Sequence, residues 1–351
     1  MHVVFDNIIF ALQKAGGISV VWQELLNRAI EDSSYQKTIL DYPSLNVCRQ
    51  ALDLSEDALT LPMRILERYR QPAYQVKDNT IFHSSYFRIL TQDNIQNITT
   101  IHDLTYHHYR SGLPKAVHIA QERYALAHSA GVICVSENTK RDLQACYPHL
   151  QEDKVRVIYN GVGKHFMPLP KVEKKEFLLF VGNRAAAYKR FDVAVGVAQR
   201  THSELVIIGS PLTSDEERYL NQALGRHQYR AVSNLPNEAL NKYYNEALCL
   251  IYPSDYEGFG IPVIEAQKAG CPVICQDTSS LSEIAQGSAL LVPHKPSNVL
   301  IDEMSSLVNQ LRNGQIPMEP LRQKGFMNAR RFSWDNTYRD TIDFYRSVLY
   351  H

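Results

Sequence analysis

The stretch ALCLIYPSDYEGFGIPVIEAQKAGCPVI, residues 247–274, decides how the chain folds. Its apolar start predicts a strand, which runs into a loop, 253–260, that contains two glycines. A helix follows from Ile261 or Pro262, since proline suits the first turn of a helix, and Gly270 with the Cys-Pro pair after it ends the helix. The next apolar run begins at once. Strand, glycine loop, helix and strand make one βαβ unit, the building block of a parallel sheet.

The same alternation of short β-branched runs and longer helix-like stretches continues on both sides of this unit. Twelve runs predict strands: HVVF, KTILDY, NTIFHS, NITTIH, GVICVS and KVRVIY in the first half, then EFLLFVG, ELVIIGS, QYRAVS, ALCLIYP, CPVICQ and SALLVP in the second. Helices are predicted, among other places, at Ser19–Glu31, Asn138–Ala145, Arg190–Thr201 and Asn237–Ala247, and the tail from Met318 is helical in pattern. This alternation predicts an α/β fold with parallel sheets.

The length and one polar segment predict two domains. A chain of 351 residues exceeds one ordinary core and suits two domains of ~150 residues each. Residues 166–176 contain two prolines and no apolar periodicity, which favours a linker. We therefore expect one α/β domain at 1–165 and another at 177–331. A cleft between them would hold the ligand, because such folds bind ligands at the carboxyl ends of their strands.

Composition limits the classes of function. Lys plus Arg and Asp plus Glu both total 37, and this balance argues against nucleic-acid binding. No run approaches the ~18 apolar residues of a membrane-spanning helix, and the N-terminus lacks the pattern of a signal peptide. The six cysteines lie mostly in apolar runs without metal-binding spacing, so we expect a reducing, cytoplasmic location.

Two glutamates flank the glycines of the loop. Gly258 and Gly260 let the backbone approach a ligand closely, and the N-terminus of a helix attracts anions and hydroxyl oxygens. We expect Glu265 in the first turn of the helix and Glu257 in the loop before it. A carboxylate accepts two hydrogen bonds side by side, which suits the vicinal hydroxyls of a ribose or a hexose. The alternative is an exposed loop residue and a favourable charge near a helix N-terminus.

The spacing E-x7-E, in EGFGIPVIE at 257–265, resembles the donor-binding motif of retaining glycosyltransferase family 4. IHDLTYHHY at 101–109 and RFSWDNT at 331–337 resemble bacterial mannosyl- and related transferases of this family. The resemblance implies the GT-B fold, in which two Rossmann-like domains face each other across a cleft. It also implies that Glu257 contacts the transferred sugar and that Glu265 holds the ribose of the nucleotide. The residues between them would bind the sugar and the diphosphate, namely Gly258, Phe259, Gly260 and Ile261.

The diphosphate of such a donor needs its charge neutralised. No Asp-x-Asp pair is present, so fixed cations rather than a metal ion are expected to supply the charge. The family resemblance assigns this contact to Arg184 and Lys189 in FLLFVGNRAAAYKRFD, where arginine would bind phosphate bidentately and lysine as a point charge. Asn183 stands where relatives commonly carry arginine. Arg190 is expected to be a solvated charge at the start of a helix.

The first domain carries further matches to the family. Gly16 and Gly17 resemble the glycine loop after the first strand, which would bring backbone N–H groups towards the diphosphate. His102 and Asp103 follow an apolar strand, and in the family this histidine faces the donor sugar. A buried structural histidine is the alternative. Ser136 is expected near the acceptor or the sugar.

Three later matches complete the resemblance. Glu283 is expected to help shape the base pocket, and the turn Asn160-Gly161 is expected to be structural. RRFSWDNTYRDTIDFYRSVL resembles the terminal helices that pack back on the first domain in this family, which places residues 332–351 with that domain.

Together these residues predict a retaining, metal-independent hexosyltransferase whose catalytic residues are His102, Glu257 and Lys189. No cofactor is expected. The substrate would be a nucleotide-diphosphate sugar, with GDP-mannose favoured over UDP- or dTDP-sugars. The alternatives are a sugar-nucleotide epimerase or hydrolase of the same fold and a non-catalytic donor-binding subunit. A nicotinamide-dependent dehydrogenase is disfavoured, because no GxGxxG follows the first strand.

The acceptor is expected to be a glycan or a lipid-linked glycan, as in the synthesis of bacterial surface polysaccharides such as lipopolysaccharide. The segment LPMRILERYRQPAY, residues 61–74, is basic and apolar. As a helix it would provide a peripheral contact with the inner face of the cytoplasmic membrane. An ordinary surface helix is the alternative.

Overall fold

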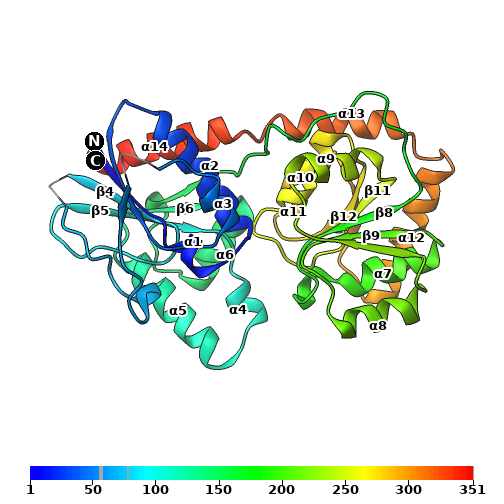
Figure 1. Ribbon diagram of the computed structural model, residues 1–351, viewed down its shortest axis with the longest axis horizontal. Helices are drawn as coiled ribbons and strands as arrows, with labels where there is room; N and C mark the ends of the chain where they lie inside the picture. Colours follow the sequence, from blue (N-terminus) through cyan, green and yellow to red (C-terminus); the bar gives the residue numbers. More distant parts are fainter. Residues whose placement is uncertain (55–57, 77–78, 351) are drawn as a thin grey trace. The chain divides into compact units, whose positions relative to one another are not determined.

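The computed structural model describes residues 1–54, 58–76 and 79–350, which form two compact units (Figure 1). The first unit comprises Met1–Gly161 and Trp334–His351, and the second comprises Val162–Ser333. The boundary therefore lies between Gly161 and Val162, a few residues before the expected end of the first domain. Each unit contains one parallel sheet with helices, which confirms the predicted α/β fold.

The first sheet has seven strands in the order β3-β2-β1-β4-β5-β6-β7, all parallel. The strands are β1 (His2–Asp6), β2 (Gln36–Asp41), β3 (Ala58–Thr60), β4 (Thr80–Ser84), β5 (Ile95–Ile101), β6 (Gly131–Cys134) and β7 (Val155–Val157). The sequence predicted all of these except β3. The chain reverses its direction of travel between β1 and β4, and such a switch point is where parallel sheets bind ligands.

Helices of unequal length connect these strands. They are α1 (Ile8–Leu12), α2 (Gly17–Glu31), α3 (Val47–Gln50), η1 (Glu67–Tyr69), α4 (Thr105–Tyr109), α5 (Gly112–Ala127), α6 (Glu137–Cys146), η2 (Glu152–Lys154) and the terminal α14 (Trp334–Tyr350). α14 packs against α2, β4 and β5, where Ile342, Phe344 and Tyr345 join the core of the first sheet. The last helix of the chain is thus part of the first unit.

The second sheet has six parallel strands in the order β10-β9-β8-β11-β12-β13. They are β8 (Leu178–Val181), β9 (Leu205–Ile208), β10 (Tyr229–Val232), β11 (Cys249–Tyr252), β12 (Val273–Asp277) and β13 (Leu290–Pro293), and each lies in a predicted run. The helices are η3 (Ala187–Lys189), α7 (Phe191–Arg200), α8 (Ser214–Ala223), α9 (Asn237–Glu246), α10 (Ile261–Ala269), α11 (Leu281–Ile284), α12 (Ser297–Arg312) and α13 (Met318–Ala329).

Two segments differ from their predicted structure. The expected linker, 166–176, is bonded to the second unit: the N–H groups of Met167 and Leu169 donate to the side chains of Asn241 and Asn245 on α9. The expected basic helix at 61–74 is a loop with the single short turn η1. Its apolar and basic residues follow a helix-like pattern, but prolines lie near both ends of the segment and Leu66 has a φ of 60°, so a helix does not form.

None of the helices among the described residues is both long enough and apolar enough to cross a membrane.

Candidate functional site

The glycine loop between β11 and α10 is held in one conformation by its neighbours. Gly260 has a φ of +99°, and a Cβ on it would lie 2.8 Å from a methyl carbon of Leu281, so glycine is required there. The hydroxyl of Ser280 donates to the carbonyl oxygens of Glu257 and Phe259 at 2.9 and 3.0 Å. The loop therefore presents the N-terminus of α10 from a fixed position, which suits an anion.

Glu257 meets Lys189 across 68 residues of sequence. The Nζ atom of Lys189 donates to both carboxylate oxygens, at 2.6 and 2.7 Å. Glu257 is only 8% exposed, and the rings of Tyr188 and Tyr252 lie about 5.5 and 5.7 Å from the ammonium group. The pair is shielded from water, so its electrostatic interaction is stronger than that of a surface ion pair. The structure thus brings together two residues that the sequence assigned to sugar and diphosphate.

Arg184 is held inside the second unit. Its side chain is 2% exposed, and its Nε atom lies 2.8 Å from Glu216, whose pKa this hydrogen bond lowers. Its Nη2 atom donates to the carbonyl oxygens of Ser210 and Pro211. Within the described part of the chain, only Nη1 lacks a partner. The other nitrogens of Arg184 donate hydrogen bonds to Glu216 and to backbone carbonyl oxygens. The predicted diphosphate contact of Arg184 therefore depends on Nη1.

The prediction for Arg190 is wrong. Instead of a solvated charge, Arg190 precedes α7 with a φ of 49°, and its Nη1 atom donates to Asp255 at 2.9 Å. Its Nη2 atom donates to the hydroxyl of Ser297 at 2.6 Å. Arg190 and Lys189 thus form two neighbouring ion pairs to the loop that follows β11. These pairs fix the start of α7 against the glycine loop.

Glu265 lies one turn deeper in α10 than predicted. It is the fifth residue of the helix, beyond the first turn. A favourable interaction with the helix dipole therefore does not explain why a carboxyl group is found at this position. Its carboxylate accepts a hydrogen bond from the hydroxyl of Tyr244 at 3.1 Å. Burial raises its pKa to about 7, against the lowering effect of that hydrogen bond. At neutral pH this carboxyl is therefore close to its titration midpoint and can both donate and accept hydrogen bonds.

The remaining predicted residues of this unit surround the loop. Phe259 is buried and packs edge-on against Phe332, with ring centroids 5.5 Å apart, so its side chain supports the loop from inside. Gly258 lies between Glu257 and Phe259, and Ile261 is the first residue of α10. Glu283 lies in α11, three residues after Ser280, whose hydroxyl bonds to the loop.

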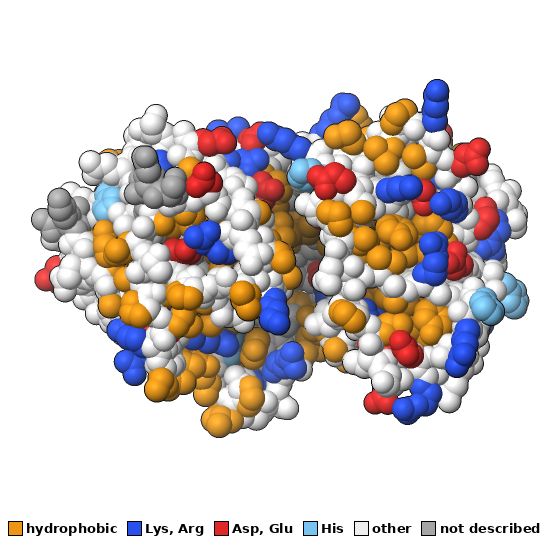
Figure 2. Space-filling view, in the orientation of Figure 1, with side chains coloured by type: hydrophobic (Ala, Val, Ile, Leu, Met, Phe, Trp, Pro, Cys, Tyr) orange, Lys and Arg blue, Asp and Glu red, His pale blue; other side chains and the backbone are white. Residues whose placement is uncertain are grey.

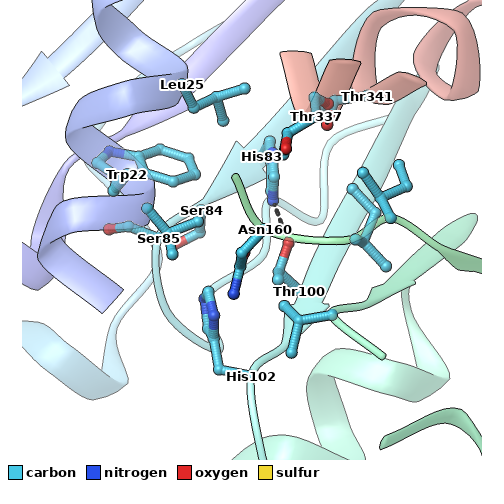
Figure 3. A pocket seen from close by; sticks show the side chains of 14 residues that line it. Trp22, Leu25, His83, Ser84, Ser85, Thr100, His102, Asn160, Thr337 and Thr341 are labelled. Atoms are coloured by element: carbon cyan, nitrogen blue, oxygen red, sulfur yellow. Dashed lines mark hydrogen bonds between the residues drawn. The ribbon is translucent and has the colours of Figure 1, made fainter. Parts of the chain in front are cut away.

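The first unit holds His102 in a small cavity of about 30 Å³ beside the carboxyl ends of β4 and β5, lined by both apolar and polar side chains. Figure 3 shows His102 below Asn160, with Ser84 and Ser85 on one side and Thr100 on the other. Burial lowers the pKa of His102 to about 4, so its ring is neutral at pH 7. A neutral imidazole offers one donor and one acceptor, which suits a hydroxyl group or a water molecule. The cavity has room for little more than one water.

His83 borders the same cavity, but both of its ring nitrogens are hydrogen-bonded to neighbouring side chains. Its Nε2 atom lies 2.8 Å from the hydroxyl of Thr100 (Figure 3). Its Nδ1 atom contacts the hydroxyl of Tyr345 on α14. Burial lowers its pKa to about 3. His83 therefore positions α14 and the cavity wall. Of the two histidines that line this cavity, His102 is the one whose ring nitrogens can hydrogen-bond to a ligand.

Two other predicted residues of the first unit have local roles. Asp103 accepts a hydrogen bond from the N–H of Thr105 at 2.9 Å, and so starts α4. Ser136 is fully buried and caps α6 by accepting from the N–H of Thr139 at 3.0 Å. The expectation that Ser136 approaches an acceptor or a sugar does not fit this burial, because capping uses its hydroxyl inside the protein.

Gly16 and Gly17 lie at the N-terminus of α2, a helix of 15 residues. A Cβ at Gly17 would meet no atom within 4 Å, and one at Gly16 would meet only the flexible side chain of Gln13. Neither backbone conformation demands glycine. The space beside Gly17 is therefore open to a ligand that needs the backbone close, as the sequence predicted for a diphosphate.

Sequence reasoning missed several residues that build the sites. Ser84 and Ser85 follow β4, and their position beside β1 at the switch point is the signal that would have found them. Asn160 was expected to be only structural, yet it lines the cavity with His102. Glu216 and Tyr244 contact Arg184 and Glu265 from distant helices, and no local pattern marks such partners.

Among the residues that the structure describes, no group of three or more His, Cys, Asp or Glu side chains is placed to hold a metal ion.

Comparison with known proteins assigns both halves of the chain to glycosyltransferases. Residues 59–164 match the family model Glycosyltransferase Family 4, and residues 163–316 match the model Glycosyl transferases group 1. The chain is 29% identical over 259 residues to an uncharacterised glycosyltransferase of Methanocaldococcus jannaschii, covering 67% of this chain and 64% of that protein. It is 34% identical over 117 residues to O-antigen chain mannosyltransferase B of Escherichia coli, covering 33% of this chain and 30% of that protein.

The matched regions thus span less than two thirds of either relative. Among solved structures, HepE from Anabaena in complex with UDP and glucose has a TM-score of 0.73 at 12% identity, with 99% of both chains covered. At this identity the likeness shows the fold alone, which is GT-B.

Proposed function

We propose that this chain, which belongs to the family 4-like glycosyltransferases of GT-B fold, transfers a hexose from a nucleotide-diphosphate sugar to a glycan or lipid-linked acceptor. The observation that carries the proposal is the shielded Lys189–Glu257 pair beside the N-terminus of α10, with Glu265 one turn further along. A cation and helix N–H groups suit a diphosphate, and two carboxyls suit hydroxyl groups.

Lys189 and the start of α10 would bind the diphosphate. In the structure, Glu257 neutralises Lys189, so the lysine is not left as an uncompensated buried charge. Arg184 would add a further donor only after its side chain moves, because Nη1, its one nitrogen without a partner among the described residues, is buried. Glu265 would bind the ribose hydroxyls, and a pKa of about 7 allows either protonation state to do so.

The reaction would break the bond between the anomeric carbon and the diphosphate oxygen and form one to the acceptor oxygen. We propose retention of configuration without a covalent intermediate, in which the departing phosphate takes the proton of the acceptor hydroxyl. Lys189 would stabilise the charge that grows on the leaving group, a preorganised electrostatic role that needs no metal ion. Neutral His102 would hold a sugar hydroxyl rather than act as a charged acid.

The donor is proposed to be GDP-mannose, in a cytoplasmic step of surface polysaccharide synthesis. The mannosyltransferase name of the Escherichia coli relative supports the sugar, although only 33% of this chain takes part in that match. UDP in the Anabaena structure supports the nucleotide class, not the base.

A thermal-shift and turnover experiment tests the proposal. The protein would be melted with GDP, UDP, dTDP, CDP and NAD, each with and without EDTA, and then incubated with the matching sugar conjugates. A rise in Tm with one nucleoside diphosphate that EDTA leaves unchanged is the expected result. Stabilisation by NAD alone would contradict the proposal.

The turnover products separate the alternatives. Transfer requires a glycoside product. Free sugar without a glycoside would indicate a hydrolase, and an epimeric donor would indicate an epimerase. Binding without any turnover across a panel of glycan and lipid-linked acceptors would indicate a donor-binding subunit.

A further inference from the structure

Helix α5 of the first unit has its apolar side turned outward. Leu113 is 76% exposed, and Val117 and Tyr124 are also exposed. Together with the exposed alanines between and after them, they recur at the spacing of one helix face: Leu113, Ala116, Val117, Ala120, Tyr124 and Ala127. An ordinary surface helix shows the opposite arrangement, with its polar side in water.

Two polar groups of α5, Glu122 and His118, are buried instead. Glu122 is fully buried, and it accepts hydrogen bonds from Nε2 of His107 at 2.7 Å and from the hydroxyl of Tyr147 at 2.6 Å. His118, one turn earlier, is buried as well, and its ring stacks on Tyr106 with centroids 3.6 Å apart. This polar interior fixes the rotation of α5, so its apolar face is built into the fold.

The loop 61–70 adds a second apolar segment beside α5. Ile65 is 84% exposed and Leu66 64%, and Leu66 is held in a left-handed conformation, with a φ of 60°, that is unfavourable for such a residue. The loop is attached to α5, because the amide of Gln121 donates to the carbonyl oxygen of Arg68 at 2.8 Å.

Buried ion pairs hold this loop rigid. Arg64 donates to Glu67 through Nε at 2.6 Å and Nη2 at 2.9 Å. Arg88 contacts Glu67 at 3.0 Å from the other side, and both of these residues are almost fully buried. The apolar side chains of the loop are therefore presented outward by a fixed scaffold.

The exposed charges of α5 and the loop 61–70 are all positive. Residues 61–70 and 104–128 contain six Lys and Arg residues and only two carboxylates, Glu67 and Glu122. Both carboxylates are buried, so the exposed charges are cationic. Orange and blue side chains accordingly gather in Figure 2 where α4 and α5 lie in Figure 1. Apolar groups among cations, with the carboxylates withdrawn, complement the surface of an anionic bilayer.

We propose that α5 and the loop 61–70 form a surface that rests on an anionic lipid bilayer. Leu113, Val117, Ile65 and Leu66 enter the boundary between headgroups and acyl chains, and the cations, such as Arg70 and Arg123, contact the lipid phosphates. The binding itself does not depend on the reaction. One consequence rests on the proposed function: a transferase held at a bilayer takes a lipid-linked acceptor in preference to a free glycan.

Vesicle co-sedimentation tests this surface with the full chain. The probes are vesicles of phosphatidylcholine alone and of phosphatidylcholine mixed with phosphatidylglycerol. We expect binding to the mixed vesicles that weakens as salt is raised. The double variant Leu113→Glu, Val117→Glu should bind about a hundredfold more weakly, since each of the two apolar side chains contributes about tenfold. Arg70→Glu with Arg123→Glu should lose a similar amount.

Helix α13 of the second unit supplies matched controls. Met327 is 63% exposed and Lys324 is exposed, so Met327→Glu and Lys324→Glu make the same chemical changes elsewhere and should leave vesicle binding unchanged. Nucleotide-dependent stabilisation, measured on every variant, shows that each one is folded. Its absence in the wild type would count against the proposed function alone.

Three results would overturn the membrane surface. The first is folded wild type that stays in the supernatant with mixed vesicles. The second is equal binding by the α5 variant and the α13 controls. The third is a concentration-dependent dimer that the α5 substitutions dissolve while vesicle binding is unaffected, which would assign the apolar face to a second copy of the chain.

Discussion

The two units share a strand order that reverses beside the first strand of each sheet, yet they place opposite chemistry at that point. The second unit gathers charge there: Lys189 with Glu257, and Arg190 with Asp255. The cavity of the first unit is lined by uncharged side chains instead, with His102 among serine, threonine, asparagine and apolar residues. The same scaffold thus provides one region suited to an ionic ligand and another suited to hydroxyl groups. The difference comes from the loops after the strands, and the sheets themselves do not cause it.

Glu257→Gln gives the largest expected effect on the charged region. The amide is similar in shape but lacks the charged acceptor proposed to bind the transferred sugar, so transfer should fall at least about a hundredfold, as for the loss of one preorganised polar contact. Nucleoside diphosphate should bind at least as tightly as before, because Glu257 no longer competes for Lys189. Initial rates and calorimetric titration measure the two quantities. A variant with near-normal turnover would remove Glu257 from the catalytic residues.

Gly260→Ala tests whether the loop of the charged region is a rigid scaffold. The φ of +99° and the contact with Leu281 should together lower the free energy of unfolding by about 1–3 kcal/mol or more. Gly314→Ala is the matched control, since Gly314 has a φ of +71° with no atom within 4 Å of the added carbon. Urea denaturation compares them. Equal losses would mean that the contact with Leu281 relaxes freely.

The pH dependence of stability should have opposite signs in the two regions. Glu265 has its pKa raised from 4.5 to about 7, so between these values the folded protein binds a proton that the unfolded chain has released. The free energy of unfolding then falls as pH rises from about 4.5 to 7. His102 has its pKa lowered from 6.5 to about 4, so its contribution rises with pH over about 4 to 6.5.

Substitution separates these two contributions. Glu265→Gln should remove the fall, and His102→Gln should reduce the rise, of which a part remains because the pKa of His83 is also lowered, to about 3. Denaturant titrations at half-unit pH steps measure both. If the Glu265→Gln profile runs parallel to that of the wild type, the carboxyl is not buried as described.

Gly17→Ala should have the smallest effect on stability. The added methyl group meets no atom within 4 Å at the start of α2, and alanine is the better helix former, so stability should rise by about 0.4–1 kcal/mol. A diphosphate that approaches this backbone would be displaced, so the KM for the donor should increase. An unchanged KM would restrict diphosphate binding to the charged region.

The sequence predicted the alternating elements well because each depends on local patterns. Twelve strands were found, and only the three-residue β3 was missed. The glycine loop was also predictable, since its turn and helix start are encoded within a few residues. The partners of the site residues were not. Glu257 meets Lys189, and Arg184 meets Glu216, across long stretches of sequence, and no local pattern encodes such pairs.

The same limit explains the errors at Arg190 and at 61–74. Both segments were interpreted from the character of their own residues. Their structure is set by distant partners, Asp255 for Arg190 and Arg88 for Glu67. A surface segment whose carboxylate turns inward looks ordinary in sequence, so the outward apolar face became visible only in three dimensions.

The place of α14 has a consequence for how the protein is made. The first unit consists of residues 1–161 and 334–351, so the second unit is an insertion within it. During translation the second unit can complete its core as soon as residue 333 has left the ribosome. The first unit must wait for Ile342, Phe344 and Tyr345, which close its core. Part of one apolar face of its sheet therefore stays uncovered for most of synthesis, and that interval is when a chaperone would be needed most.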